Sequence, residues 1–424
     1  MTQNPSTSLT SAAVKGGSAI AGAIVAMNLT TYAFTILGAR LMGPRSFGAF
    51  TAVMNVLLVA AVLALALQAT AARRIAREPG DVHEVERTIL LVGRRSAIGL
   101  GILFLLLSPV VNLALRLHSL PTAILLAITV APTTLMGAQA GVLQGERRWV
   151  PLSLVYLAAG LPRLLLGIVL LAWKPEELTA VVAVAIGAFA PVLIAGFALR
   201  QPRGTDSGAP GTDDHSARAL WWETVYNSQA LLAFLVLSSI DIVLARNALS
   251  GHQAGLYAGG LIMVKAVTFL PQFVVVLAFP SMGTDDARRR ALLSSLVLVA
   301  VTGLVVTLGV RLLPHLALVF VGGSEYDAIR DRLWVFAILG TVLSMLQLLV
   351  YSVLAKQSRS SVALLWISLV PLVVLGLSSS TVLQLATRVL CVDAVLLALL
   401  LSISLWRLRA DGLTTQPATV DQAD

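Results

Sequence analysis

Five charged residues of this chain lie inside long apolar stretches, where a charge has the strongest reason to be functional. They are Arg163, Asp241, Lys265, Arg388 and Asp393. A charge at the centre of a membrane helix costs about 2.5–3.5 kcal/mol on insertion scales. Each of the five therefore requires a partner, a water-filled cavity or a function.

Two of these charges are cations that we expect near the middle of the bilayer. Lys265 lies about eleven residues into its apolar stretch, which at about 1.5 Å per residue is close to mid-depth. Arg163 follows Pro162, and a proline inside a helix frees a carbonyl that a guanidinium or water can satisfy. We predict that both cations bind an anionic substrate, such as a diphosphate or a sugar acid. Alternatively, Lys265 pairs internally with Asp241 on the preceding helix.

The three remaining charges have other predicted roles. Asp241 is a carboxylate among apolar neighbours, so it could exchange protons during a transport cycle, and it is the candidate for ion coupling. Arg388 and Asp393 share a helix, but five residues turn a helix about 140° beyond one revolution, so they do not face each other. We predict that this pair is structural.

Uncharged polar side chains also occur in the first two apolar stretches. Asn28, Tyr32, Asn55 and Gln68 could form a wall that hydrogen-bonds to a sugar. Hydrogen bonds between helices are the alternative, because such bonds are common in membrane bundles. The sequence leaves both interpretations open.

The composition indicates which elements position these residues. Hydrophobic residues make up 57% of the chain and charged residues 12%, against about a quarter charged in ordinary soluble proteins. A span needs roughly 20 apolar residues. Twelve stretches qualify, at 14–37, 48–72, 95–115, 121–143, 150–173, 178–199, 219–245, 254–281, 289–313, 333–355, 360–377 and 382–406. We therefore predict an all-α polytopic membrane protein.

The distribution of Lys and Arg predicts the orientation. With the amino terminus inside, nineteen of the 30 basic residues fall on the cytoplasmic side and eight fall outside. This bias predicts a protein of the cytoplasmic membrane with both termini in the cytoplasm. It also accounts for the net charge of +9 through attraction to anionic membrane lipids, without a nucleic-acid partner.

A polar segment divides the twelve stretches into six and six. Residues 200–218 are rich in Gly, Pro, Ser and Asp, which is typical of a flexible linker. The predicted organisation is a cytoplasmic tail (1–13), a six-helix bundle (14–199), the linker (200–218), a second six-helix bundle (219–406) and a second tail (407–424).

Short patterns recur at matching places in the two halves. Ala39-Arg40 and Gly48-Ala49-Phe50 match Ala245-Arg246 and Gly255-Leu256-Tyr257, and Leu113-Ala114-Leu115 after Pro109 matches Leu316-Ala317-Leu318 after Pro314. Six helices per half insert both halves the same way up, so the repeat is parallel, about an axis along the membrane normal. Coincidence in a chain rich in Leu, Ala and Val is the alternative.

Several chemistries find no support in the sequence. The single cysteine, Cys391, allows no internal disulfide and leaves too few thiols for a structural zinc site. No phosphate-binding loop follows a predicted strand, so ATP cannot drive this chain directly. The longest outer stretch, 311–332, resembles a segment lying along the interface more than a catalytic loop. We predict neither a cofactor, nor a metal, nor an enzyme.

The motifs of both halves resemble a known family. They are Ser239-Ile240-Asp241-Ile242-Val243-Leu244-Ala245-Arg246, Ala254-Gly255-Leu256-Tyr257-Ala258, Phe269-Leu270-Pro271 and Phe279-Pro280, with Leu41-Met42-Gly43-Pro44 and Phe47-Gly48-Ala49-Phe50 in the first half. The chain is similar to bacterial polysaccharide transporters of the multidrug/oligosaccharidyl-lipid/polysaccharide (MOP) exporter superfamily. This resemblance implies two six-helix bundles around a cavity that carry an isoprenoid-diphosphate-linked oligosaccharide outward by alternating access.

The expected function is therefore that of an oligosaccharide flippase. Membrane lipids are expected partners, together with a polysaccharide polymerase or glycosyltransferase, and the chain is expected to act as a monomer. The alternatives are an ion-coupled multidrug exporter of the same superfamily and a membrane scaffold without transport. The sign of the cavity discriminates between the carriers, because cationic drugs require carboxylates and diphosphates require Lys or Arg.

Overall fold

The computed structural model describes residues 5–77, 82–200, 217–269, 285–356 and 359–414. Almost all of the expected linker and the motifs from Leu270 to Pro280 lie outside the described residues. In the described part of the chain, helices are joined by short turns and there is no strand. The all-α fold class predicted from composition is confirmed.

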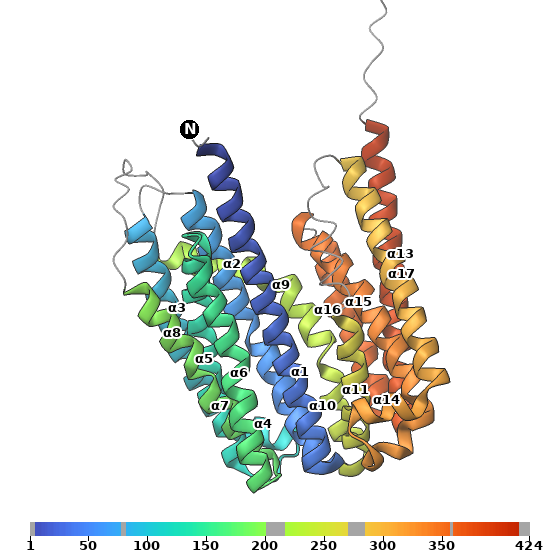
Figure 1. Ribbon diagram of the computed structural model, residues 1–424. Coiled ribbons are helices and arrows are strands. Elements are labelled where there is room, and N and C mark those ends of the chain that lie inside the picture. Colours follow the sequence, from blue (N-terminus) through green and yellow to red (C-terminus); the bar gives the residue numbers. More distant parts are fainter. Residues whose placement is uncertain (1–4, 78–81, 201–216, 270–284, 357–358, 415–424) are drawn as a thin grey trace, which may run out of the picture.

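The helices form two groups that succeed one another along the chain (Figure 1). The first comprises α1 (Pro5–Ala60), α2 (Val62–Arg77), α3 (Val82–Leu106), α4 (Ser108–Ala114), α5 (Leu120–Gly145), α6 (Trp149–Trp173), α7 (Glu177–Gly187) and α8 (Phe189–Leu199). The second comprises α9 (Ala217–Leu237), α10 (Ile240–Ala248), α11 (Gly251–Thr268), α13 (Asp285–Leu312), α14 (Pro314–Val321), the 3₁₀ helix η2 (Ser324–Arg332), α15 (Leu333–Lys356), α16 (Arg359–Leu377) and α17 (Val382–Thr414).

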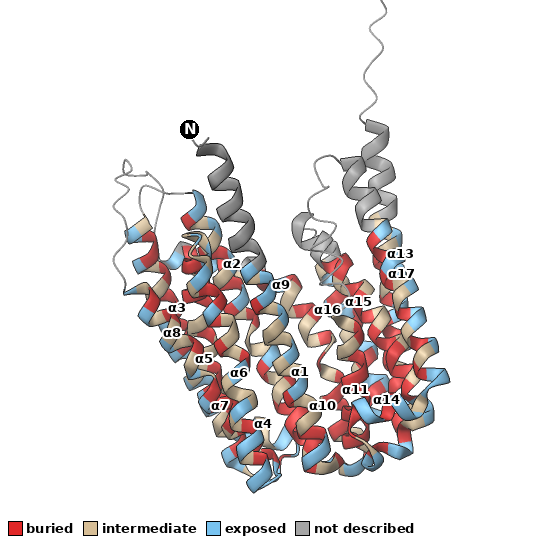
Figure 2. Ribbon diagram, in the orientation of Figure 1, coloured by how far each residue is buried: buried red, intermediate tan, exposed pale blue. Residues whose placement is uncertain are grey.

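Nine stretches of the described residues are long and apolar enough to cross a bilayer, and the first of them, Ala19–Arg77, holds the first two predicted spans. Val362–Leu377 is a shorter apolar helix. Of the predicted span at 254–281, the structure describes α11 and Phe269, and the rest lies outside the described residues. Large apolar side chains on the periphery are exposed, as Figure 2 shows, including Leu106, Trp173 and Leu312 at 73–80%. Lipid is the solvent that such a surface requires.

The first two spans are joined without a loop, at Gly43 and Pro44. Gly43 has φ 68° and ψ 167° inside what is otherwise one long helical stretch. Glycine adopts this conformation without a Cβ penalty, and Pro44 cannot continue the preceding helix because it lacks an N–H. The chain therefore reverses at this point, and the second span continues through α2. The end of the molecule that holds this reversal is called the outer end below, following the charge-based prediction.

At three places a helix extends beyond the predicted apolar span, because apolarity marks the membrane and not the helix. α3 begins at Val82 and not near residue 95, so Arg87, Arg94 and Arg95 lie on a helix and not in a loop. α1 begins at Pro5 inside the expected tail, and α17 continues to Thr414 beyond residue 406. Charged residues such as Arg and Glu are good helix formers, so a helix continues past the apolar segment.

The two groups of helices meet at the outer end through a pair of glycines. A Cβ on Gly48 would lie 2.9 Å from the Cα of Gly255, and a Cβ on Gly255 would collide with the main chain of Pro44. Small residues permit such backbone contact between membrane helices. Gly48 and Gly255 are the matching glycines of the two sequence halves. Because Gly48 contacts its own counterpart, an axis that relates the two halves must pass close to this pair of glycines.

Substituting Gly255 with alanine should disturb this junction without introducing a polar group. Overpacking of this kind costs about 1–3 kcal/mol, so we expect the Gly255→Ala protein to melt at a lower temperature in detergent. Gly309→Ala is the matched control, because a Cβ there meets nothing within 4 Å. Equal melting temperatures for the two variants would contradict the close contact.

Candidate functional site

A cavity of about 390 Å³ lies within the first bundle and reaches the second. Helices α1, α5, α6, α7, α8 and α11 contribute to its walls. Its uncharged polar lining consists of Asn28, Thr31, Thr35, Thr51, Thr129 and Thr133. Its charged lining among the described residues consists of Arg163 and Lys265, and none of these lining residues is acidic. The cavity is therefore cationic.

Arg163 is positioned by the tight packing of α6 against α1. Cβ atoms on Gly160 and Gly167 of α6 would collide with Thr30 and Phe34 of α1. This contact brings the Arg163 guanidinium to Thr31, whose hydroxyl accepts a hydrogen bond from Nη2. The same guanidinium lies 5.8 Å from the centroid of the Phe34 ring, within the range of a cation–π interaction.

Arg163 also retains unused hydrogen-bonding capacity. Its Nε is buried and has no hydrogen-bond partner in the structure. A guanidinium presents five donors in a planar fork that suits phosphate and carboxylate groups. Arg163 thus offers donors to an anion in the cavity while Thr31 and Phe34 hold its side chain in place.

Among the described residues that line the cavity, Lys265 comes from the second bundle. It occupies the last turn of α11. Its ammonium group forms no hydrogen bond or ion pair with another described residue, and this includes the expected partner Asp241. Lys265 is nevertheless close enough to Asp241 to be attracted by it and to Arg163 to be repelled by it. Lys265 is thus influenced both by an acid of the second bundle and by the second cation of the cavity.

Asp241 follows a break in the seventh span. α9 ends at Leu237 and α10 begins at Ile240, so Asp241 is in the first turn of the nine-residue helix that forms the outer part of this span. Its carboxylate is buried and accepts hydrogen bonds from the Tyr257 hydroxyl at 2.9 Å and the Ile242 N–H at 2.7 Å. Broken spans of this kind form ion and substrate sites in many transporters.

Arg388 and Asp393 occupy different environments on α17. Nη1 of Arg388 donates to the Leu375 carbonyl at 2.8 Å and to the hydroxyls of Ser378 and Ser379 at 2.9 and 3.0 Å. Arg388 therefore caps the end of α16. Asp393 is 1% exposed, its Oδ1 has no hydrogen-bond partner in the structure, and it is close enough to Asp241 to repel it.

The four uncharged polar residues singled out in the sequence have separate locations. Asn28 lines the cavity. Tyr32 packs edge-on against Phe269, with 6.0 Å between ring centroids. Asn55 is buried and donates to the Thr51 carbonyl at 2.8 Å. Gln68 donates to Gln144 and to Tyr156, at 2.9 and 2.7 Å. Tyr32, Asn55 and Gln68 thus contact other helices or their own backbone, and they are absent from the described cavity lining.

The outer end is closed by an arginine from the second bundle. Arg246, 5% exposed at the end of α10, donates through Nε to the Leu115 carbonyl at 2.8 Å and through Nη2 to the Arg116 carbonyl. Asn247 donates to the Ala114 carbonyl at 2.7 Å. These carbonyls end α4, where Arg116 takes φ 46°. The last carbonyls of a helix lack helical partners, and a cation there also compensates the partial negative charge at the end of the helix.

The first bundle supplies a matching arginine. Nη2 of Arg40 donates to the Val319 carbonyl, near the end of α14, at 2.7 Å. Arg40 and Arg246 are equivalent in the sequence repeat, and so are Leu113-Ala114-Leu115 at the end of α4 and Leu316-Ala317-Leu318 in α14. Each half therefore places an arginine on the short helix of the other half. We call Arg40 and Arg246 the clamp arginines.

Several of these residues were not predicted to be functional. The cavity threonines Thr129 and Thr133 are one turn apart on α5, which places them on one face of that helix, but nothing in the sequence identifies that face as the cavity wall. The clamp arginines were counted as loop charges. Their signal was the recurrence of Ala-Arg at the same place in both halves, which predicted a repeat but not a contact between its members.

Comparison with known proteins agrees with this geometry. No protein-family model and no curated protein sequence matches the chain. An inward-facing multidrug resistance MATE family transporter of the MOP superfamily superposes with a TM-score of 0.68 at 15% identity, over 92% of this chain and 96% of its own. An outward-facing structure of such a transporter gives 0.64 at 14% identity, over the same shares of the two chains.

Two further structures superpose over nearly the whole chain. The lipid II flippase MurJ, in an inward closed conformation, has a TM-score of 0.67 at 10% identity, over 96% of this chain and 94% of its own. A MOP superfamily transporter from Pyrococcus furiosus, whose binding pocket is described as having reversed polarity, has a TM-score of 0.61 at 14% identity, over 92% of this chain and 96% of its own. The chain therefore has the polytopic all-helical fold that these MATE and MurJ structures share, as the resemblance had led us to expect.

Removing a clamp arginine should favour opening of the outer end. Hydrogen bonds to charged groups contribute about 1.5–3 kcal/mol each, so we expect Arg246→Ala to raise the outward-open population by at least about tenfold. Spin labels on cysteines at Lys174 and Asp331, in a Cys391→Ser background, would report it as a longer distance between the bundles. Arg311→Ala, an exposed arginine on the same side, should leave the distance unchanged. An unchanged distribution in Arg246→Ala would contradict the role of the clamp.

Proposed function

We propose that this protein translocates an isoprenoid-diphosphate-linked oligosaccharide across the cytoplasmic membrane by alternating access. The observation that carries this proposal is the sign of the cavity, whose charged lining in the described structure is Arg163 and Lys265. Two cations that repel each other in an empty cavity gain from an anion between them. A diphosphate supplies a dense negative charge that suits a guanidinium and an ammonium together.

The uncharged lining is compatible with a glycan. Threonine hydroxyls and the Asn28 amide line the cavity together with apolar side chains such as Met27, Met54 and Met136. Hydroxyls and amides both donate and accept hydrogen bonds, as sugars do. Polar groups of this kind orient a sugar, while the two cations fix the charged end of the same molecule.

A multidrug exporter remains the second candidate, and the fold comparison favours it equally because MATE transporters share the fold. A carrier of organic cations requires carboxylates that face the substrate. Here the buried carboxylates Asp241 and Asp393 are absent from the described cavity lining. The lining therefore favours an anionic substrate. A scaffold without transport leaves the two cavity cations without a function.

The position of Lys265 suggests how an ion gradient drives the cycle. Lys265 is attracted by Asp241 and lines the cavity, so the charge on Asp241 determines how strongly Lys265 is held back from a substrate anion. Protonation of Asp241, or binding of a cation there, releases Lys265 toward the anion. The Lys265 side chain then couples ion binding at Asp241 to substrate binding in the cavity, because it interacts electrostatically with both.

Neutralising either cavity cation should abolish export. In cells carrying Lys265→Ala or Arg163→Ala, we expect at least a tenfold loss of surface polysaccharide and accumulation of the completed lipid-linked oligosaccharide, measured by mass spectrometry. The Lys265→Ala protein should reach the membrane at a normal level, because the Lys265 ammonium is bonded to no other described residue. Arg163→Ala also removes the contacts with Thr31 and Phe34, so its level in the membrane is measured beside its activity. Lys174→Ala removes an exposed lysine and is the control.

The lipid profile distinguishes the two candidate carriers. Accumulation of one completed lipid-linked oligosaccharide in cells lacking the protein identifies both the step and the cargo. An unchanged lipid profile, together with increased sensitivity to cationic dyes, would instead establish the exporter. Normal lipids, normal dye resistance and full activity of Lys265→Ala would leave only the scaffold.

Asp241 should affect coupling more than binding. The Asp241→Asn amide retains a hydrogen-bond acceptor for Tyr257 but cannot change its charge. In proteoliposomes we expect Asp241→Asn to lose the acceleration of transport by an imposed proton or sodium gradient, while exchange between equal substrate pools continues. Asp327→Asn, an exposed carboxylate on η2, is the control. Gradient-driven transport at the native rate in Asp241→Asn would remove this residue from the coupling mechanism.

A further inference from the structure

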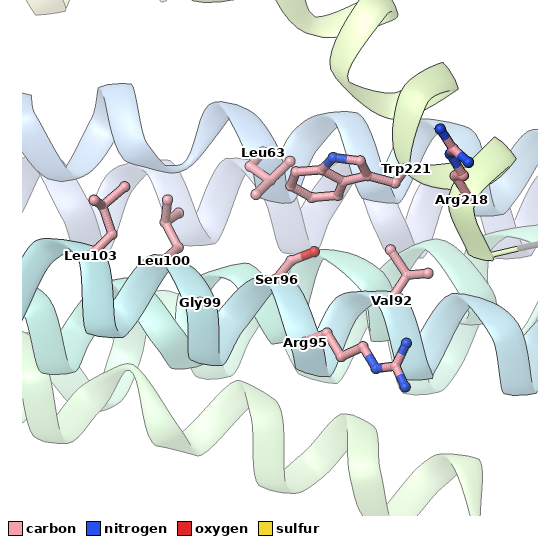
Figure 3. Close-up of a pocket in the computed structure, with 9 residues that line it drawn as sticks. All are labelled: Leu63, Val92, Arg95, Ser96, Gly99, Leu100, Leu103, Arg218 and Trp221. Carbon is pink, nitrogen blue, oxygen red and sulfur yellow. The ribbon is translucent and has the colours of Figure 1, made fainter.

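A second hollow lies on the lipid-facing side of the molecule, where α9 crosses α2 and α3. It has a volume of about 580 Å³ and is lined by Leu63 of α2, by one face of α3 and by the first turns of α9 (Figure 3). The residues from α3 include Val92, Arg95, Ser96, Gly99, Leu100 and Leu103. Their spacing of three and four residues follows one side of a helix. We call this hollow the α3–α9 groove.

The groove has one charged end and one apolar end. Arg218 of α9 and Arg95 of α3 lie on opposite sides of the end that holds Trp221, and Leu100 and Leu103 lie toward the other end (Figure 3). Arg95 and Leu103 are eight residues apart on α3, which is about 12 Å along the helix. This length matches the upper part of an acyl chain below a phosphate. Tryptophan at the charged end suits the boundary between headgroups and hydrocarbon.

Both arginines are available for a ligand. Arg95 and Arg218 are exposed, and neither guanidinium is hydrogen-bonded or ion-paired to another described residue. They lie on the arginine-rich side of the molecule, which we expect to face the cytoplasm and its anionic leaflet. A nearby arginine attracts an anionic headgroup by about 1 kcal/mol in that leaflet.

We propose that the α3–α9 groove binds one anionic phospholipid, with the phosphate between Arg95 and Arg218 and an acyl chain along Leu100 and Leu103. The groove is separate from the transport cavity, since the two share no lining residue. Nothing in this proposal depends on the identity of the transported substrate.

A lipid in this groove would also affect the position of α9. Leu220 of α9 packs in a cluster with residues of α2, α3 and α5, whereas Phe234 and Leu237 of the same helix pack in a larger cluster that spans both bundles and includes residues of α10, α11 and α15. α9 therefore begins against the first bundle and ends inside the second. A lipid that contacts α3 and the start of α9 together holds this crossing helix in the arrangement described here.

The first test compares two lipids that differ only in charge. The purified full-length protein is titrated with phosphatidylglycerol or phosphatidylcholine of identical acyl chains, and bound lipid is measured by native mass spectrometry. We expect one phosphatidylglycerol molecule to be retained preferentially. Arg95→Gln and Arg218→Gln should each weaken its binding about fivefold, whereas Arg94→Gln, an exposed neighbour on α3 outside the groove, should not.

The second test blocks the apolar end without touching the charges. A Cβ on Gly99 meets nothing within 4 Å, so Gly99→Leu fills the groove without a clash inside the protein. We expect this variant to lose preferential binding and the increase in melting temperature that phosphatidylglycerol gives the native protein. Gly309→Leu, at an equally open glycine on α13, should behave as the native protein does.

Three outcomes would overturn the proposal. Equal retention of both lipids would show an ordinary lipid-facing surface. Selective retention that persists in the Arg95→Gln/Arg218→Gln double variant would place the lipid elsewhere. Loss of export in Gly99→Leu with phosphatidylglycerol selectivity intact would assign the groove to the isoprenoid tail of a substrate.

Discussion

The contact between Gly48 and Gly255 is the constraint on which the rest of the structure depends. Because neither residue has a side chain, the backbones of the two bundles meet directly at the outer end. Every other contact across this end, from the clamp arginines to the packing of Phe47 on Tyr326, requires that approach. The same contact brings α11 beside α1 and so delivers Lys265 to a cavity formed mainly by the other bundle. The contact that closes the outer end is thus also the contact that completes the cavity.

The charged residues in the interior are separated by sign. The cations Arg163 and Lys265 line the cavity, and the carboxylates Asp241 and Asp393 lie behind it in the second bundle. The carboxylate of Asp241 accepts a hydrogen bond from Tyr257, whereas Oδ1 of Asp393 has no partner among the described residues, and a buried charge without partners is costly. In the proposed transport cycle, this separation would give an anion and a cation different binding places, with Lys265 near both.

The sequence predicted the fold well because the physics of a bilayer is simple. Stretches of about 20 apolar residues define spans, and an intramembrane charge is costly enough to be informative, which is why Arg163 and Lys265 could be selected together. Orientation about a helix axis was harder to predict. Asn28 lines the cavity, but Tyr32, one turn later, packs on Phe269, and Asn55 bonds to its own helix. The start of α3 was missed because helices continue into water wherever their residues favour helix.

The clamp arginines have a consequence for how this protein tolerates change. Their acceptors are main-chain carbonyls of Leu115, Arg116 and Val319, and a carbonyl is present whatever side chain a codon specifies. Substitutions along α4 and α14 can therefore accumulate without loss of a hydrogen bond across the outer end, provided that the helices still end at the same places. The arginines have less freedom: Arg246 donates to two carbonyls and Arg40 to one, and both contacts use the reach and the permanent charge of a guanidinium. Over evolutionary time each contact therefore tolerates substitution at the carbonyl that accepts the hydrogen bond but not at the arginine that donates it.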